Sequence, residues 1–225
     1  MLFIAFSFKE LDFNHCKIRK LENLERLKKI KFLGFRQNLI KRIENLDRLV
    51  SLTSLELYDN QLTKIDNLDL LINLEVLDLS FNRVRKIENL DRLIKLKKLF
   101  LVHNKIDRIE NLDNLVNLEM LELGDNKIRV LENLQMLSQL KELYVGKNKI
   151  RKIENLDALE NLQILSMQFN DNLLDQWTDV EELKDLPCLH TVYFERNPIY
   201  KDATYRRKMM LCLPQVKQID ATLCR

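Results

Sequence analysis

The chain has 225 residues, of which 46% are apolar and 32% are charged, yet its formal net charge is only +3. So balanced a charge does not indicate a polybasic protein, and nucleic-acid binding is not expected. Three glycines and three prolines leave no flexible linker or low-complexity segment, so one continuous structure is expected.

The chain begins with the apolar segment MLFIAFSF, which Lys9 follows at once. No basic residue precedes this segment, which argues against a secretory signal, and it is far too short to cross a membrane. We expect residues 1–6 to lie over the first coil or to be disordered, and residues 9–13 to form the end of a strand. No polar cap is evident here, so this edge is either exposed or covered by further coils in related proteins.

From Cys16 onward the sequence repeats every 22 residues. Counted from the Cys or Asn that opens each copy, the residues at positions 2, 5, 8, 11, 14, 17 and 19 are apolar in all seven full copies. A period in the twenties with the pattern L-x-x-L-x-L-x-x-N/C-x-L is typical of leucine-rich repeats. The asparagines at the repeating position are Asn38, Asn60, Asn82, Asn104, Asn126, Asn148 and Asn170.

The spacing within one copy predicts its structure. Leucines at 99 and 101 alternate as in a half-buried strand, whereas apolar residues every third position from 84 to 96 favour a short 3₁₀-like or helical return. One copy buries too little apolar surface to offset the ordering of its backbone, so the copies must stack. The expected fold is an α/β leucine-rich repeat solenoid with 22-residue repeats, a parallel sheet on the concave face, short returns on the convex face and a C-terminal cap.

The repeating asparagine is expected to turn into the interior, where its amide donates to and accepts from backbone groups of adjacent coils. Cys16 is expected to take the same place in the first copy. The alternative is that these asparagines are surface turn residues.

Charged residues also form columns. An acid six positions after the Asn precedes an Asn-Leu pair in every copy, and a Lys or Arg stands at position four in most copies. We interpret these columns as solvated edges of the solenoid, in which the bases screen the acids, and not as binding sites.

Regularity ends after Asn170, where Asn172 is a second candidate for the turn position and Asn197 is the next clear one. We assign residues 1–172 to the repeat array and residues 173–225 to the last repeat and the C-terminal cap. The elements expected in this cap are a helical turn at 177–183, a strand at 189–194, a basic amphipathic helix at 205–213 that Pro214 ends, and a segment from Val216 to Ile219 folded back on the last coil.

Residues that could carry chemistry do not form a site. The three histidines lie at turn or strand positions, the three glycines form no phosphate loop, and no nucleophile-and-base arrangement recurs at one place. The four cysteines lack metal-binding spacing and indicate thiols in a reducing compartment, the cytosol or the nucleus. We therefore expect no enzyme, no cofactor and no metal. The residues concerned are His15, His103, His190, Gly34, Gly124, Gly146, Cys16, Cys188, Cys212 and Cys224.

The residue four before each turn should point outward from the sheet, and this column alternates acids with aromatics. Phe100 and Tyr144 are expected to be exposed, and exposed rings flanked by carboxylates are typical of protein interfaces. The alternative is that these are ordinary strand residues with β propensity. In order, the column contains Asp12, Gly34, Glu56, Asp78, Phe100, Glu122, Tyr144, Ser166 and Tyr193.

The repeat unit K-I-E-N-L-D-x-L-x-x-L-x-x-L-x-L-x-x-N and the tail TVYFERNPIYKDATYRRKMMLCLPQVKQIDAT resemble the regulatory subunit 7 family of protein phosphatase 1. The resemblance implies a monomeric, non-catalytic scaffold of the nucleus and cytoplasm that binds the phosphatase catalytic subunit on its concave face and modulates its activity. It carries the family's binding column onto Asp78, Phe100, Glu122, Tyr144 and Tyr193, with Tyr144 where the family usually has Phe.

The resemblance also implies that several coils are missing where the sequence passes from LSMQFN to DNLLDQW, together with an acid and a Trp of the binding column, and that the family's acidic N-terminal extension is absent. One competing hypothesis is a general protein-interaction module of a splicing or cytoskeletal assembly. Another is nucleic-acid binding through the basic column and residues 206–208, which the interleaved acids disfavour.

Overall fold

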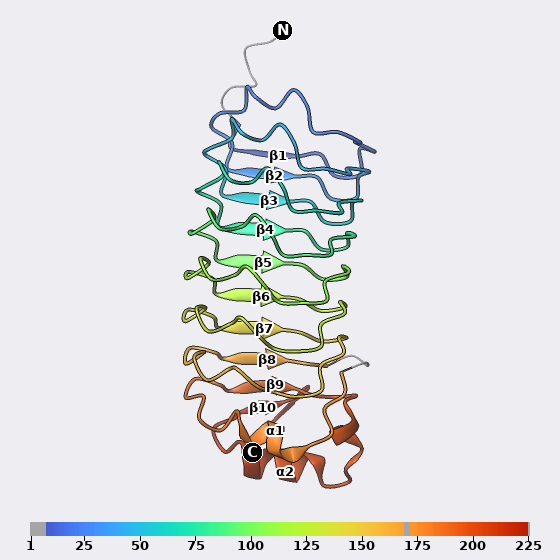
Figure 1. Ribbon diagram of the computed structural model, residues 1–225, viewed down its shortest axis with the longest axis vertical. Coiled ribbons are helices and arrows are strands. Elements are labelled where there is room, and N and C mark those ends of the chain that lie inside the picture. The colour runs from blue at the N-terminus through green and yellow to red at the C-terminus, as the bar shows by residue number, and fades with distance from the viewer. Residues whose placement is uncertain (1–7, 169–171, 225) are drawn as a thin grey trace.

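The computed structural model describes residues 8–168 and 172–224, which form one stack of coils with a continuous sheet along it (Figure 1). The eleven strands lie side by side in chain order, and all neighbours are parallel except the last pair. The strands are β1 Glu10–Asp12, β2 Phe32–Gly34, β3 Ser54–Glu56, β4 Val76–Asp78, β5 Lys98–Phe100, β6 Met120–Glu122, β7 Glu142–Tyr144, β8 Ile164–Ser166, β9 Thr191–Tyr193, β10 Gln218–Ile219 and β11 Thr222–Leu223.

The middle residue of each strand from β2 to β8 is a fully buried leucine that enters the core. Leu55 pairs with Leu77, and Leu77 pairs with Leu99, so the stack advances by one repeat with no change of register. All three leucines are fully buried. The predicted 22-residue solenoid with a parallel sheet is therefore confirmed.

The returns are built from pairs of turns. In one return, the Leu93 amide donates to the Leu90 carbonyl at 2.9 Å and the Leu96 amide donates to the Leu93 carbonyl at 2.9 Å. These bonds have the spacing of a 3₁₀ helix, as expected, but the turns do not join into a continuous helix. Because every third residue is an inward leucine, each turn delivers one side chain to the core.

The asparagines form the interior ladder that the sequence predicts. The Asn104 Oδ1 accepts from the Val84 amide at 2.9 Å, and its Nδ2 donates to the Leu79 carbonyl at 3.0 Å. Both partners belong to the preceding coil, and Asn104 is only 9% exposed. The alternative of surface turn residues is wrong for the described members of the ladder.

The two ends of the ladder differ from its middle. Cys16 does not take an asparagine's place, because it is exposed and its thiol contacts the carbonyl of Asn14 instead. At the other end, Asn172 continues the ladder by accepting from the Ile150 amide at 3.0 Å and donating to the Val145 carbonyl at 2.9 Å. Asn170, the other candidate, lies outside the described residues, as does the segment 1–6.

A second asparagine ladder explains the recurring Glu-Asn-Leu. Asn89 and its equivalents have positive φ, which asparagine tolerates better than most residues, and this conformation turns the chain into the return. The Asn89 Nδ2 also donates to the Ile65 carbonyl of the preceding coil at 2.8 Å. The repeat pattern alone did not predict this role for the asparagine.

The C-terminal cap contains α1 Trp177–Glu181 and α2 Tyr205–Cys212, close to the predicted ranges, and η1 Pro198–Lys201, which was not predicted. Its buried centre is Asp220, whose carboxylate accepts from the Phe194 and Glu195 amides and from the Tyr205 hydroxyl. The predicted return of the chain is confirmed, since Ile219 is fully buried and pairs with β9. No helix in the described part of the chain is long and apolar enough to span a bilayer.

Candidate partner-binding face

The predicted column forms one straight row across the sheet. Asp78 pairs with Phe100, Phe100 with Glu122 and Glu122 with Tyr144, so the four occupy adjacent strands. The row then crosses the junction after β8 without a shift, because Ser166 pairs with both Tyr144 and Tyr193. The structure therefore brings together the five residues that the resemblance singled out.

The acids of the row are tied to the backbone of their own strands. Asp78 is 8% exposed and accepts from the Ser80 amide at 2.9 Å, and Glu122 accepts from the Gly124 amide at 3.0 Å. These carboxylates are fixed in place, and part of their hydrogen-bonding capacity serves the fold.

Burial changes the ionisation of one of these acids. The pKa of Glu122 is raised to about 7, because the sheet and its neighbours remove water from the carboxylate. The hydrogen bond from Gly124 lowers the pKa, but it does not outweigh this desolvation. Near neutral pH, the protonated form of Glu122 is therefore populated alongside the carboxylate.

The aromatic residues are less exposed than expected. Phe100 and Tyr144 are half-buried among their neighbours on the sheet. The Tyr144 hydroxyl donates to Glu142 at 2.7 Å, and desolvation and this carboxylate raise the pKa of Tyr144. Tyr193 accepts from the Gln218 side chain at 2.8 Å. Hydrogen bonds thus hold the Tyr144 and Tyr193 side chains, and all three rings remain partly exposed.

A shallow hollow of about 240 Å³ adjoins Glu122 and Tyr144, with Gly124 and Gly146 among its lining residues. Gly146 has a steric reason to be glycine, since a Cβ there would stand 2.3 Å from the Gln168 carbonyl oxygen. The two small residues leave room beside the Tyr144 ring. A partner side chain of modest size would fit this space.

Beside the row lies an exposed strip that the sequence analysis largely missed. The Arg36 guanidinium lies 5.6 Å from the centre of the Tyr58 ring, and that ring lies 4.9 Å from Phe81. Phe81 in turn stacks on His103 at 4.8 Å. These residues come from the two positions before the turn, where no regular pattern of residue types recurs along the sequence.

Across residues 8–168 and 172–224, no group of three or more His, Cys, Asp or Glu side chains is placed to hold a metal ion. His103 contacts Asp125, which Lys147 also approaches at 2.7 Å, so this histidine belongs to a surface ion cluster. The arrangement is suited to recognising another protein.

Comparison with known families defines the class. A family model described as leucine-rich repeat matches residues 105–224, and a model of two leucine-rich repeat copies matches residues 50–92 and 72–114. The chain belongs to the leucine-rich repeat family.

Within that family, part of the chain is similar to named regulators of one phosphatase. A 53-residue segment is 62% identical to protein phosphatase 1 regulatory subunit 7 of Xenopus tropicalis and 60% identical to that of Homo sapiens. A 57-residue segment is 51% identical to protein phosphatase 1 regulatory subunit SDS22 of Schizosaccharomyces pombe. These matches cover 24% of this chain and 15–17% of the relatives. They confirm the predicted resemblance over that part of the chain, and their names agree with a non-enzymatic role.

Solved structures share the fold over most of the chain. An internalin from Listeria monocytogenes matches 97% of this chain and 62% of its own, with a TM-score of 0.82 and 25% identity. Internalin C2 of the same species matches 88% of this chain and 83% of its own, with a TM-score of 0.72 and 26% identity. This likeness concerns the solenoid fold.

Proposed function

We propose that this chain is a non-catalytic regulatory scaffold that binds the catalytic subunit of protein phosphatase 1 through its sheet face and modulates its activity. The observation that carries the proposal is the unbroken row of acids and rings, together with relatives that are named as regulatory subunits of this phosphatase. The nucleus and cytoplasm are the proposed compartments. The proposed contacts are Asp78, Phe100, Glu122, Tyr144 and Tyr193.

The chemistry of the row defines the surface it would bind. Phe100 lies between Asp78 and Glu122 on adjacent strands, so an apolar ring has an acidic side chain on either side. Such a row favours a partner that presents an apolar side chain flanked by lysines or arginines. The hollow beside Tyr144 offers a second point of contact.

The alternative is a general protein-interaction module that uses the same face for a different partner. The segments that match the phosphatase regulators cover only 24% of the chain, so the rest of the chain fits this alternative equally well. The phosphatase scaffold and the general module would both bind through the row, but only the scaffold requires the phosphatase as its partner.

The test is binding of the purified phosphatase catalytic subunit, measured by isothermal titration calorimetry. The wild-type chain should bind, the Phe100→Ala, Glu122→Ala double variant should bind at least tenfold more weakly, and urea unfolding of the variant should show that it is folded. Arg85→Ala with Arg129→Ala is the matched control, since both side chains are exposed after the turn, away from the sheet.

Two results would count against the proposal. Failure of the wild-type chain to bind the catalytic subunit would favour the general module. Undiminished binding by the double variant would show that another surface makes the contact. Phosphatase activity measured with and without the chain then tests the modulation separately from binding.

A further inference from the structure

A row of exposed aliphatic side chains runs along the returns, at the position twelve residues after the ladder asparagine. Branched aliphatic residues occupy this position in four consecutive coils. The row, called here the return ridge, consists of Val50, Ile72, Ile94 and Val116, which are 49%, 50%, 52% and 42% exposed.

The ridge has no role in the core and has clear ends. The returns bury the residues on either side of it, such as Leu71 and Leu74, while Ile72 between them points to solvent. In the coils beyond the ridge, the same position is Lys28 at one end and Ser138 at the other. An apolar patch rimmed by polar residues is typical of an interaction site.

The backbone beneath the ridge is fixed by a third set of side-chain bonds. The Asn73 Nδ2 donates to the Val50 carbonyl at 2.9 Å, and the Asn117 Nδ2 donates to the Ile94 carbonyl at 2.8 Å. Each bond joins one coil to the next at the ridge. Val50 and Ile94 therefore project from backbone that is bonded to the next coil.

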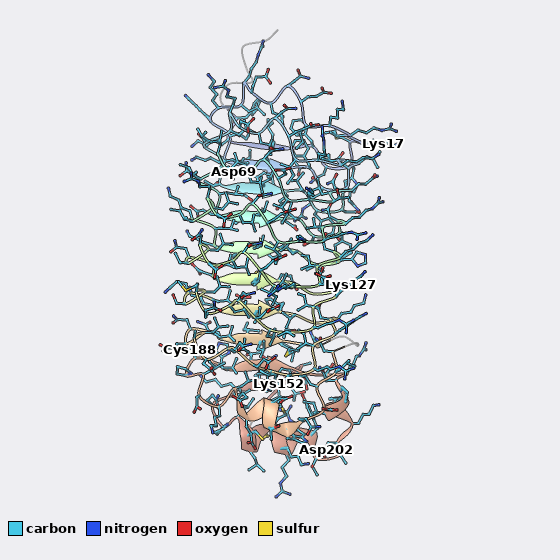
Figure 2. All side chains as sticks on the ribbon, viewed as in Figure 1. Lys17, Asp69, Lys127, Lys152, Cys188 and Asp202 are labelled. Atoms are coloured by element: carbon cyan, nitrogen blue, oxygen red, sulfur yellow. The ribbon has the colours of Figure 1, made fainter. Side chains whose placement is uncertain are left out.

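Acids accompany the ridge three residues earlier in the sequence of each coil. Asp47, Asp69, Asp91 and Asp113 are exposed and take part in none of the salt bridges of the described residues. Asp69 lies on the side of the stack opposite Lys17 and Lys127 (Figure 2).

Asp69 and Asp113 differ from the other two acids, because no arginine follows them directly. Asp47 and Asp91 are each followed by an arginine, whereas Leu70 follows Asp69 and Asn114 follows Asp113. The negative charge beside the ridge is therefore greatest at Asp69 and Asp113, which lie two coils apart.

We propose that the return ridge binds an amphipathic helix of another protein, laid along the axis of the stack with its apolar face on the ridge and lysines or arginines beside Asp69 and Asp113. A helix advances about 5.4 Å per turn. Neighbouring strands of a sheet are about 4.8 Å apart, so one helical turn meets one coil, with a mismatch of about 2 Å over the ridge. Basic residues seven apart on the helix, about 10.5 Å, would match the two acids.

A second copy of this chain fits the ridge less well. A stable dimer buries about 800 Å² per partner, which four aliphatic side chains do not supply. Two copies joined along the ridge would also bring like-charged aspartates together. This surface lies on the returns and not on the sheet, so it is independent of the proposed phosphatase contact.

The probe is a synthetic 15-residue helical peptide with leucines on one face and lysines beside them, added to the full chain with labelled isoleucine methyl groups. Binding should shift the Ile72 and Ile94 methyl resonances and leave those of the fully buried Ile40 and Ile150 in place. A peptide of the same composition with its leucines spread around the helix should bind at least tenfold more weakly.

Three variants test the residues. Ile72→Ser with Ile94→Ser should weaken peptide binding at least tenfold while leaving the urea midpoint unchanged, because both side chains are exposed. Asp69→Asn with Asp113→Asn should weaken it several-fold at low salt and little at high salt. Arg85→Ala is the control and should bind as the wild type does.

The proposal is overturned by any of four results: no methyl shift at millimolar peptide, equal binding of the two peptides, wild-type affinity of the double serine variant, or a dimer of the chain that this variant abolishes. The last result would assign the ridge to a second copy.

Discussion

Replacing one ladder asparagine tests the physical basis of the stack. Asn104→Ala removes an amide whose Oδ1 accepts from the Val84 amide at 2.9 Å and whose Nδ2 donates to the carbonyls of Leu79, Leu101 and Val102 at 3.0, 3.1 and 3.2 Å. The Val84 amide and the Leu79 carbonyl would be left without this partner inside the stack. Each buried unsatisfied group costs about 1–3 kcal/mol, so the free energy of unfolding should fall by about 2–6 kcal/mol.

The assay is urea unfolding followed by far-ultraviolet circular dichroism. Asn114→Ala is the matched control, because it makes the same chemical change ten residues later, on the exposed side of a return. The control should lie within about 0.5 kcal/mol of the wild type. If Asn104→Ala costs no more than Asn114→Ala, the interior amide is not what joins the coils, and the account of the ladder is refuted.

Three further effects should be measurable in the same way. Asn111→Ala, which removes one half-buried bond to the preceding coil and an asparagine of positive φ, should cost about 1–2 kcal/mol, less than the ladder variant. Gly146→Ala should destabilise the chain because of the Gln168 carbonyl, whereas Gly34→Ala, whose methyl would meet only side-chain atoms at 3.3 Å, should be tolerated far better. Glu122 has a folded pKa of about 7, above its ordinary value of 4.5. Its contribution to the free energy of unfolding is therefore present below about pH 4.5 and is lost as the pH rises to 7. Glu122→Gln should remove this dependence of the free energy of unfolding on pH, measured by urea unfolding at several pH values.

Much of the fold could be predicted because the repeat places the same chemistry at the same point of every coil. The strand register follows from the leucine spacing. The sequence alone therefore predicts that the residues from Asp78 to Tyr144 lie in one row on adjacent strands, as they do. The predictions for the asparagine ladder were less certain at its two ends, where the 22-residue period alone does not identify the ladder residue. Cys16 matches the pattern but sits in the first described coil, and Asn172 continues the ladder 24 residues after Asn148.

The surfaces were harder to predict than the core. Apolar residues at core positions recur in every copy, whereas the ridge position is aliphatic in only four coils and the position of Phe81 changes residue type from coil to coil. Their significance depends on which side chains meet across neighbouring coils, as Tyr58, Phe81 and His103 do. Sequence spacing places such residues on the same edge of the solenoid. Which of their side chains touch depends on how neighbouring coils are positioned, and the sequence spacing does not give this.

The hydrogen bonds of the row determine which residue gives the clearest test of partner binding. Asp78→Ala removes the acceptor of the Ser80 amide, so it should lower the free energy of unfolding by about 1–3 kcal/mol as well as any affinity. Phe100 has no hydrogen-bonding group and stands half-buried at the centre of the row. Phe100→Ala should therefore weaken phosphatase binding at least tenfold with a smaller shift in the urea midpoint than Asp78→Ala. Calorimetric binding and urea unfolding of both variants test this prediction. Normal binding by the Phe100→Ala chain would show that Phe100 is an ordinary strand residue with β propensity and not a binding contact.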